Sequence, residues 1–115
     1  MASVEIRHDS GVAIVALAGE IDLQTSPSVR AAILETLSLK QPMVIDLTAV
    51  RYIDSSGVAS LVEGFQTARR QGSAFILAGV SASAMRVFQL ARLDRVFALA
   101  ETVPQALTQA RRGAA

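Results

Sequence analysis

A short segment near the middle of the chain limits the possible folds more than any other. Residues 43–47, Met-Val-Ile-Asp-Leu, are typical of a buried strand, and the motif Asp-Ser-Ser-Gly follows at 54–57. Apolar residues then recur with the period of a one-sided helix, at Val58, Leu61, Val62 and Phe65. The sequence therefore predicts a strand, a tight turn and a helix, with a serine hydroxyl at the positive end of the helix.

Strands and helices alternate along the rest of the chain. Two strands come first, at 4–7 and 12–17, with turn-forming Asp-Ser-Gly at 9–11 between them. The predicted elements that follow are a helix at 26–39 capped by Ser26, a strand at 43–47, a helix at 58–70, a strand at 74–78, a helix at 83–91, a strand at 96–99 and a helix at 102–111. This order predicts an α/β fold in one domain over residues 4–111: a mixed, mostly parallel sheet with an N-terminal β-hairpin and about four helices packed on it.

Composition narrows the classes of function. The net charge is +1 and basic residues are not concentrated on any predicted face, which argues against direct nucleic-acid binding. The chain has no cysteine and one histidine, His8, so we expect no metal site and no cofactor, and we place His8 on a strand surface. The longest apolar run, 12–18, is too short for membrane insertion, and the start lacks the apolar stretch of a secretory signal, so we expect a cytoplasmic protein.

The motif at 54–57 has two interpretations. In the first, one of the two serine hydroxyls caps the helix by accepting a free backbone N–H, and Gly57 permits a close approach and unusual backbone angles. In the second, Ser55 carries a phosphate, which would add about −1.5 to −2 charges that the helix dipole partly offsets and that Asp54 repels. The fold would survive this modification, whereas the charge of the exposed surface would change sharply.

Enzymatic interpretations have little support. A serine nucleophile needs a base, and the sole histidine lies on the first predicted strand; nucleotide-binding glycine loops and the Gly-x-Ser-x-Gly elbow are absent. Asp22 and Asp54 both follow strands, so the topology can bring them to one edge, where they would either cap turns or hold Mg²⁺. Asp46 is expected to point outward from its strand or to bond a neighbouring loop.

Three segments together resemble a known family. They are Gly-Glu-Ile-Asp at 19–22, Val-Ile-Asp-Leu at 44–47 and Tyr-Ile-Asp-Ser-Ser-Gly-Val at 52–58. Their order and spacing resemble the STAS domain family, and within it the anti-sigma factor antagonists of the SpoIIAA and RsbV type, over residues 4–110. Ala59 is a small departure, because close relatives often have glycine there.

The resemblance implies a non-catalytic, phospho-switched regulator. Ser55 would be phosphorylated by an anti-sigma factor serine kinase of the GHKL type, with Ser56 as the next candidate, and a PP2C-type phosphatase would reverse the step. The unphosphorylated form would bind the kinase through Asp22, Asp54, Ser56 and Gly57. From the residues themselves, Met85, Phe88 and Leu90 are expected to border the same face, with Arg86 among the partner-binding residues. The free protein is expected to be a monomer.

Two other functions remain open from the sequence. Stand-alone STAS proteins resembling MlaB are structural subunits of lipid-transport ABC complexes, although those relatives more often show Asp-Thr-Ala-Gly at the motif. STAS domains also serve as sensors of small ligands or nucleotides. Co-purification with an ABC ATPase would indicate the first function, and stoichiometric nucleotide binding would indicate the second.

Overall fold

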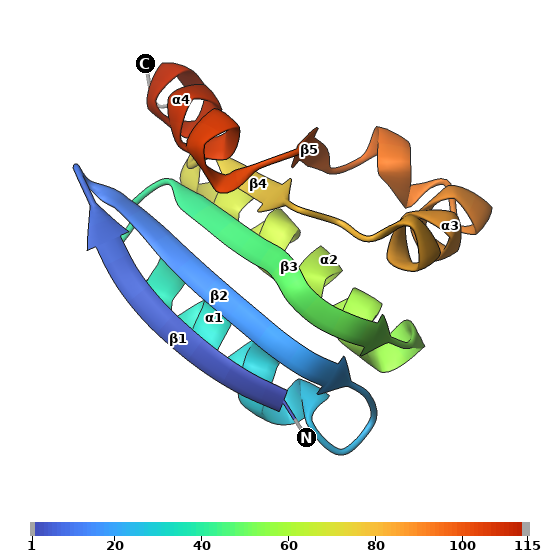
Figure 1. The fold of residues 1–115 in the computed structure, drawn as a ribbon. Helices are drawn as coiled ribbons and strands as arrows, with labels where there is room; N and C mark the ends of the chain where they lie inside the picture. Colours follow the sequence, from blue (N-terminus) through green and yellow to red (C-terminus); the bar gives the residue numbers. More distant parts are fainter. Residues whose placement is uncertain (1, 114–115) are drawn as a thin grey trace.

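Five strands form one mixed sheet in the order β1-β2-β3-β4-β5 in the computed structural model, which describes residues 2–113 (Figure 1). The strands are β1 (Ala2–Asp9), β2 (Val12–Ile21), β3 (Met43–Ile53), β4 (Phe75–Ala78) and β5 (Ala98–Ala100). The helices are α1 (Ser26–Leu37), α2 (Ser55–Gln71), α3 (Ala82–Leu90) and α4 (Val103–Gly113), and a 3₁₀ turn, η1, spans Leu93–Arg95. Only β1 runs antiparallel to its neighbour, which confirms the predicted α/β class and hairpin.

The hairpin turn has two residues, Ser10 and Gly11, both with positive φ (52° and 83°). A two-residue turn with positive φ at both positions matches the right-handed twist of the strands that it joins. It pairs Asp9 with Val12 and sets the register of the whole β1–β2 ladder, which the predicted Asp-Ser-Gly turn anticipated.

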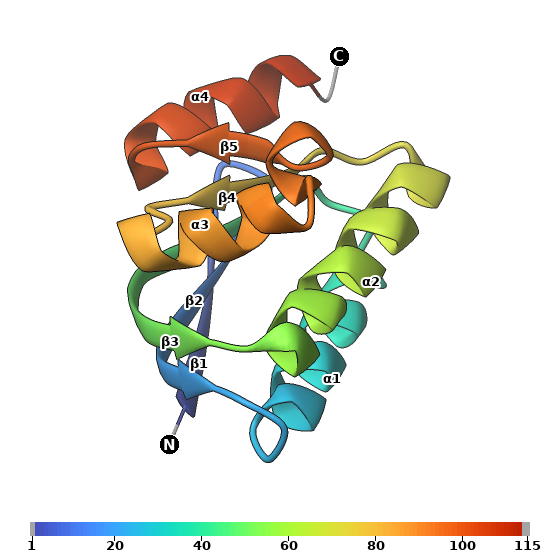
Figure 2. The same cartoon turned by 90° about the vertical axis from the view of Figure 1, so that its right-hand side faces the viewer.

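Helices cover the two faces of the sheet unequally. One face packs against α1, α2 and α3, through buried side chains that include Ile33, Leu61 and Phe88. The other face packs only against α4, whose Ala106 and Ala110 contact a smaller apolar cluster. Figures 1 and 2 show α4 alone on its side, across one end of the sheet. The aliphatic composition of the chain suits this arrangement, because such side chains fill the space between helices and sheet.

Several predicted boundaries were wrong. The second and third strands are longer than predicted and end at Ile21 and Ile53, and β5 lies at 98–100 rather than 96–99. Ser26 does not cap α1: it is the first helical residue, its N–H donates to the Asp22 carbonyl, and Thr25 precedes it without a capping side-chain bond. Neighbouring strands determine these extensions, since the two long strands continue each other's hydrogen-bonded ladder beyond their apolar runs.

The other helix ends follow their local sequence. A left-handed Gly72 ends α2 after Arg69 and Arg70, as predicted. Ser81 caps α3 by accepting the Ala84 N–H at 3.1 Å, so this helix begins one residue earlier than predicted. Among the helices of residues 2–113, none combines the length and the hydropathy needed to span a membrane.

Candidate functional site

The site lies where two neighbouring parallel strands end. The register pairs Ile21 of β2 with Ile53 of β3, so the next residues, Asp22 and Asp54, leave the sheet side by side. The Asp54 N–H donates to the Ile21 carbonyl at 3.1 Å and joins the two turns directly. Figure 1 shows both arrowheads at the same end of the sheet, with α2 beginning there. The structure therefore confirms that Asp22 and Asp54 reach one edge.

Asp54, and neither serine, caps α2. Its Oδ1 accepts the N–H groups of Ser56 at 2.9 Å and Gly57 at 3.2 Å, while its carbonyl accepts the Val58 N–H at 2.9 Å. The backbone of Asp54 is extended, as expected of a capping residue. The prediction that a serine hydroxyl caps this helix was wrong, because the carboxylate one residue earlier reaches the same amides first.

Ser55 is left with an exposed hydroxyl at the first position of α2. Within residues 2–113, its side chain has no hydrogen-bond partner. Ser56 follows half-buried, and its carbonyl accepts the Ser60 hydroxyl at 3.2 Å. The two serines of the motif therefore differ in access, and Ser55 is the one that a macromolecule can reach.

Gly57 is required by a close approach. A Cβ on Gly57 would lie 2.6 Å from Ile53 Cγ1, 2.7 Å from Ile21 Cγ2 and 3.1 Å from the Ile21 carbonyl oxygen. Gly57 is not among the residues with positive φ, so the predicted unusual backbone angles were wrong while the close approach is confirmed. The glycine lets the start of α2 sit directly on the ends of β2 and β3.

Asp22 organises the second turn. Its Oδ1 accepts the N–H groups of Gln24 and Thr25 at 3.0 Å, and the Thr25 hydroxyl lies 3.1 Å away. The same hydroxyl accepts the Asp22 N–H at 2.9 Å and lies 2.9 Å from the Glu20 carbonyl. The Thr25 N–H lowers the pKa of Asp22 below its ordinary value, with smaller contributions from the Thr25 hydroxyl and the Gln24 N–H. Thr25 was not singled out in the sequence, although a threonine three residues after an aspartate is a recognisable turn signal.

Two contacts hold α2 against α1 behind the site. The buried Ser60 hydroxyl lies 3.4 Å from the Ser26 carbonyl. Farther along, Arg30 and Glu63 form two hydrogen bonds of 2.8 Å and 2.7 Å between guanidinium and carboxylate. This pairing lowers the pKa of Glu63 and raises that of Arg30. The first turn of α2 is thus fixed by packing that does not involve Ser55.

The partner-binding residues expected on α3 are only partly placed as predicted. Arg86 and Leu90 are exposed, the latter by 82%, whereas Phe88 is fully buried in the core and Met85 is half-buried. The prediction that Phe88 borders a binding face was therefore wrong. Its ring packs against Phe97, with ring centroids 5.6 Å apart.

A small groove separates α3 from the end of β3. It measures about 140 Å³ and is lined by side chains that include Tyr52, Ser83 and Val87. Arg86 does not line it, and within residues 2–113 its guanidinium forms no ion pair. Tyr52 is 54% exposed and Leu23, in the neighbouring turn, 74%. The surface around Ser55 therefore includes large apolar side chains that the sequence alone did not indicate.

Metal binding finds little support at this edge. Over the described part of the chain, residues 2–113, no group of three or more His, Asp and Glu side chains could hold a metal ion. The oxygens of Asp22 and Asp54 that would bind a cation already accept backbone N–H groups. Asp46 similarly bonds within its own strand, to the N–H and hydroxyl of Thr48. His8 is exposed on β1, as predicted, with Nδ1 3.0 Å from the side-chain oxygen of Gln41.

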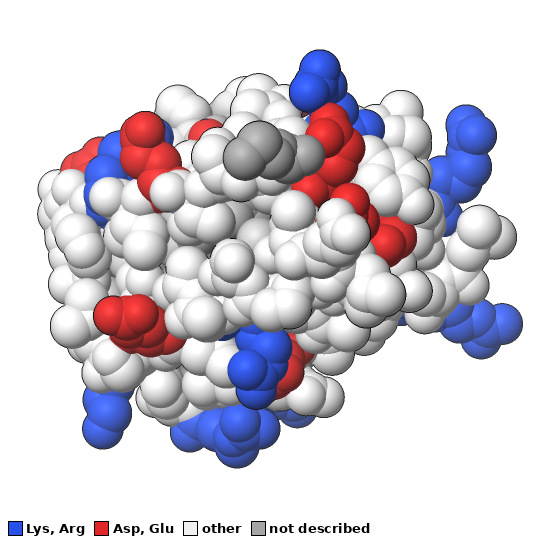
Figure 3. Space-filling model, turned by 90° about the horizontal axis from the view of Figure 1, so that it is seen from below, with Lys and Arg blue, Asp and Glu red and all other residues white. Residues whose placement is uncertain are grey.

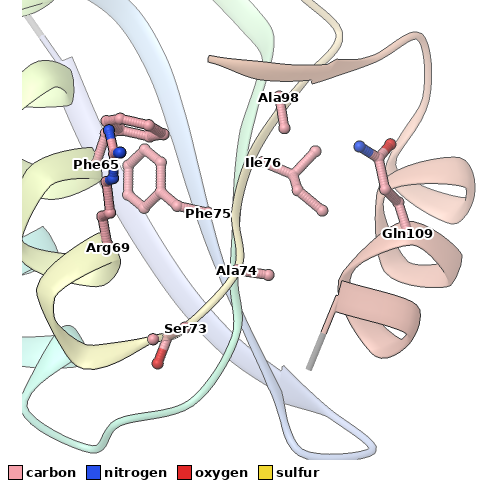
Figure 4. A pocket seen from close by; sticks show the side chains of 9 residues that line it. Phe65, Arg69, Ser73, Ala74, Phe75, Ile76, Ala98 and Gln109 are labelled. Carbon is pink, nitrogen blue, oxygen red and sulfur yellow. The ribbon is translucent and has the colours of Figure 1, made fainter. Parts of the chain in front are cut away.

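A separate cavity of about 350 Å³ lies at the opposite end of the sheet, between α2, β4 and α4. Phe65, Phe75 and Ile76 form much of its wall, and Figure 4 shows Arg69 and Gln109 on opposite sides of it. It contains none of the residues of the Asp-Ser-Ser-Gly turn. A small-ligand function, if this chain has one, would therefore use a different region from Ser55.

The face seen from below the sheet carries no continuous basic patch. Figure 3 shows Lys and Arg toward its rim and a broad uncharged region between them. One of the ion pairs, Arg51 with Glu20, has its nitrogen and oxygen 3.1 Å apart and lies near the ends of β3 and β2. Together with that bond, other charge interactions lower the pKa of Glu20.

The aspartate turns, the strand order and the helix that begins at Ser55 agree with a family model. The model of the STAS domain matches residues 3–106. This chain belongs to the STAS domain family. An anti-sigma-B factor antagonist of Listeria monocytogenes is 37% identical to this STAS domain over 97 residues, covering 82% of this chain and 84% of the relative.

Solved structures show the same fold. An anti-sigma factor antagonist from Mycobacterium paratuberculosis superimposes with a TM-score of 0.89 at 29% identity, covering 96% of this STAS domain and 95% of that chain. The Bacillus cell fate determinant SpoIIAA in its phosphorylated form superimposes with a TM-score of 0.73 at 20% identity, covering 93% of this chain and 98% of that one. The family resemblance predicted from three short segments is thereby confirmed.

Proposed function

We propose that this STAS domain is an anti-sigma factor antagonist that is switched by phosphorylation of Ser55. The observation that carries the proposal is the free, exposed hydroxyl of Ser55 beside a helix cap that Asp54 already provides. A kinase can reach this hydroxyl, and its modification breaks no hydrogen bond within residues 2–113. The names of the relatives and the phosphorylated form of SpoIIAA are consistent with this function.

A phosphate on Ser55 changes the surface and leaves the fold intact. It adds about −1.5 to −2 charges at neutral pH, next to the carboxylates of Asp54 and Asp22. The positive end of α2 offsets part of this charge, but the amides of Ser56 and Gly57 already bond Asp54. The added charge therefore projects outward and repels a partner that fits the unmodified surface.

The partner is an anti-sigma factor that is also a serine kinase of the GHKL type. Exposed Leu23 and Tyr52 supply the apolar contact area beside Ser55, and Asp22 and Asp54 supply acidic groups at its edge. Apolar and aromatic side chains usually dominate such contacts. Arg86, exposed on α3, would lie toward the border of the contact. The kinase contributes ATP and Mg²⁺, and a PP2C-type phosphatase restores the binding form, so the antagonist itself performs no catalysis.

The test is phosphorylation by the cognate kinase, followed by intact-mass and phosphosite analysis. Wild type and Ser56→Ala should each gain one phosphate on Ser55, and Ser55→Ala should gain none. Labelling of Ser55→Ala at the wild-type rate would refute the site and leave Ser56 as the next candidate.

Binding of the kinase provides the second measurement. Ser55→Asp should weaken binding by about a hundredfold, since misplaced charge in an interface costs several kcal/mol. The matched control is Ser28→Asp, which adds the same charge to the exposed first turn of α1 and should leave binding unchanged. Co-purification with an ABC ATPase, unaffected by Ser55→Asp, would instead indicate the structural subunit function.

A further inference from the structure

Strand β1 forms an open edge of the sheet. It is the first strand in the order, it spans eight residues, and only β2 pairs with it (Figure 1). From Glu5 to Asp9 every residue is exposed. An edge of this length presents a row of unpaired main-chain groups, and proteins usually cover or interrupt such an edge.

The outward-facing main-chain groups belong to Val4, Ile6 and His8. The two-residue turn makes Asp9 and Val12 a hydrogen-bonded pair, and bonded and non-bonded pairs then alternate along the ladder. The N–H of Ala13 confirms this phase, because it points away from β1 and donates to the Pro42 carbonyl at 2.9 Å. Every second residue of β1, beginning with His8, therefore directs its N–H and C=O to the free edge.

We propose that a second copy of this chain pairs with this edge, β1 against β1 in antiparallel orientation, with the two-fold axis at Ile6. This register pairs Ser3 through Asp9 of one copy with the same residues of the other in reverse order. The three outward-facing residues then form about six main-chain hydrogen bonds across the axis. The resulting contact is isologous, and it joins the two five-stranded sheets into one continuous sheet.

Charge selects this register over its alternatives. With the axis at Ile6, Glu5 of each copy lies opposite Arg7 of the other, which gives two opposite-charge pairs on one face. The register of equal length has its axis at Glu5 and places that carboxylate opposite its own copy. An axis at Arg7 opposes like charges twice over, arginine to arginine and Glu5 to Asp9. Opposite charges directly across a strand pair stabilise it, whereas like charges destabilise it.

The side chains on the two faces fit the same arrangement. Ile6 pairs with Val15 in the hairpin and so lies on the face covered by α1, where it is 42% exposed. The two-fold brings both copies of Ile6 together and covers them. Glu5 and Arg7 point to the other face, and Figure 1 shows no helix over the part of β1 farthest from α4. The cross-strand ion pairs therefore form without displacing any element.

This inference differs from the monomer expected from the sequence, and it goes beyond the proposed phospho-switch. Ser55 follows the carboxyl end of β3, two strands away from the β1 edge. Dimerisation should therefore be the same in wild type and Ser55→Asp. Failure of either proposal would leave the other standing.

Analytical ultracentrifugation of the full chain, with charge-swap variants, tests the pairing. Wild type should show a concentration-dependent monomer–dimer equilibrium. Glu5→Arg and Arg7→Glu should each raise the dimer dissociation constant about tenfold or more, because two attractive pairs become repulsive. The double variant Glu5→Arg/Arg7→Glu should restore the wild-type constant, and so should an equimolar mixture of the two single variants. Unchanged thermal melting would show that all variants are folded.

A single introduced cysteine tests the position of the axis. The chain has no cysteine of its own, so Ile6→Cys reports only on contact between copies. Opposed residues of a hydrogen-bonded pair have Cα atoms about 5.5 Å apart, within the range that a disulfide spans. Ser3→Cys is the control, because this register separates its two copies by about 20 Å. Ile6→Cys should give an oxidised dimer much faster than Ser3→Cys.

Three results would overturn the proposal. One is a wild-type chain that stays monomeric up to about 1 mM, the weakest association of interest here. Another is a dimer whose dissociation constant does not respond to either single charge variant. The third is disulfide formation by Ser3→Cys as fast as by Ile6→Cys.

Discussion

The two turns at the carboxyl edge of the sheet use the same device for different ends. In each, an aspartate follows a parallel strand and accepts the N–H groups two and three residues ahead: Asp22 from Gln24 and Thr25, Asp54 from Ser56 and Gly57. After Asp54 the helix begins at once, whereas after Asp22 a loop intervenes before α1.

The hydroxyl residues of the two turns show what the difference means. The Thr25 hydroxyl lies within 3.1 Å of Asp22 and Glu20 atoms and holds its loop together. The Ser55 hydroxyl bonds nothing within residues 2–113, because the neighbouring carboxylate already satisfies the helix. One turn uses its hydroxyl for structure, and the other leaves its hydroxyl free for chemistry. Three substitutions, ordered by expected effect, test this contrast.

Gly57→Ala should have the largest effect on stability. Its Cβ would come within 2.7 Å of Ile53 and Ile21 side-chain carbons, and overpacking of this kind costs roughly 1–3 kcal/mol. Urea denaturation followed by circular dichroism measures the loss. Ser56→Ala, one residue earlier, is the control and should stay within about 0.5 kcal/mol of wild type. Equal stability of Gly57→Ala and wild type would mean that the two turns are not tightly packed.

Thr25→Val should cost about 1 kcal/mol, because it removes the hydroxyl that accepts the Asp22 N–H while keeping nearly the same shape. Ser55→Ala removes the corresponding free hydroxyl and should leave the free energy of unfolding within about 0.5 kcal/mol of wild type. The same denaturation experiment compares them. Equal losses for the two variants would contradict the assignment of one hydroxyl to structure and the other to function.

The smallest effect concerns pH. Backbone N–H groups lower the pKa of folded Asp22 below its ordinary value of 3.8, so the folded state favours the ionised form. The stability that this provides is fully present above the unfolded pKa and is lost as the pH falls through the lower folded pKa. Wild type should therefore be more stable than Asp22→Asn at neutral pH, and the difference should shrink on acidification below about pH 4. A difference that is constant with pH would show that the charge of Asp22 contributes nothing.

The sequence predicted the turn at Asp54 better than the turn at Asp22. An apolar strand, a capping motif and a regular helical period lie within one short stretch there, and local signals of this kind survive folding. It could not tell which oxygen caps α2, since Asp54 and the serines all lie within reach of the same amides. Phe88 was misplaced for a related reason. A nine-residue helix between partly apolar faces does not reveal which face a neighbouring ring, here that of Phe97, will cover.

By itself, the sequence determined the order of strands and helices, the hairpin turn and the position of a serine at the start of a helix. These depend on local backbone preferences and on the spacing of apolar residues. Only the tertiary structure decided that Asp22 and Asp54 leave the sheet together, that Ser55 is free, and that β1 has an open edge. Those features depend on the register between strands distant in sequence and on which backbone N–H groups neighbouring elements already bond, and no local pattern encodes either.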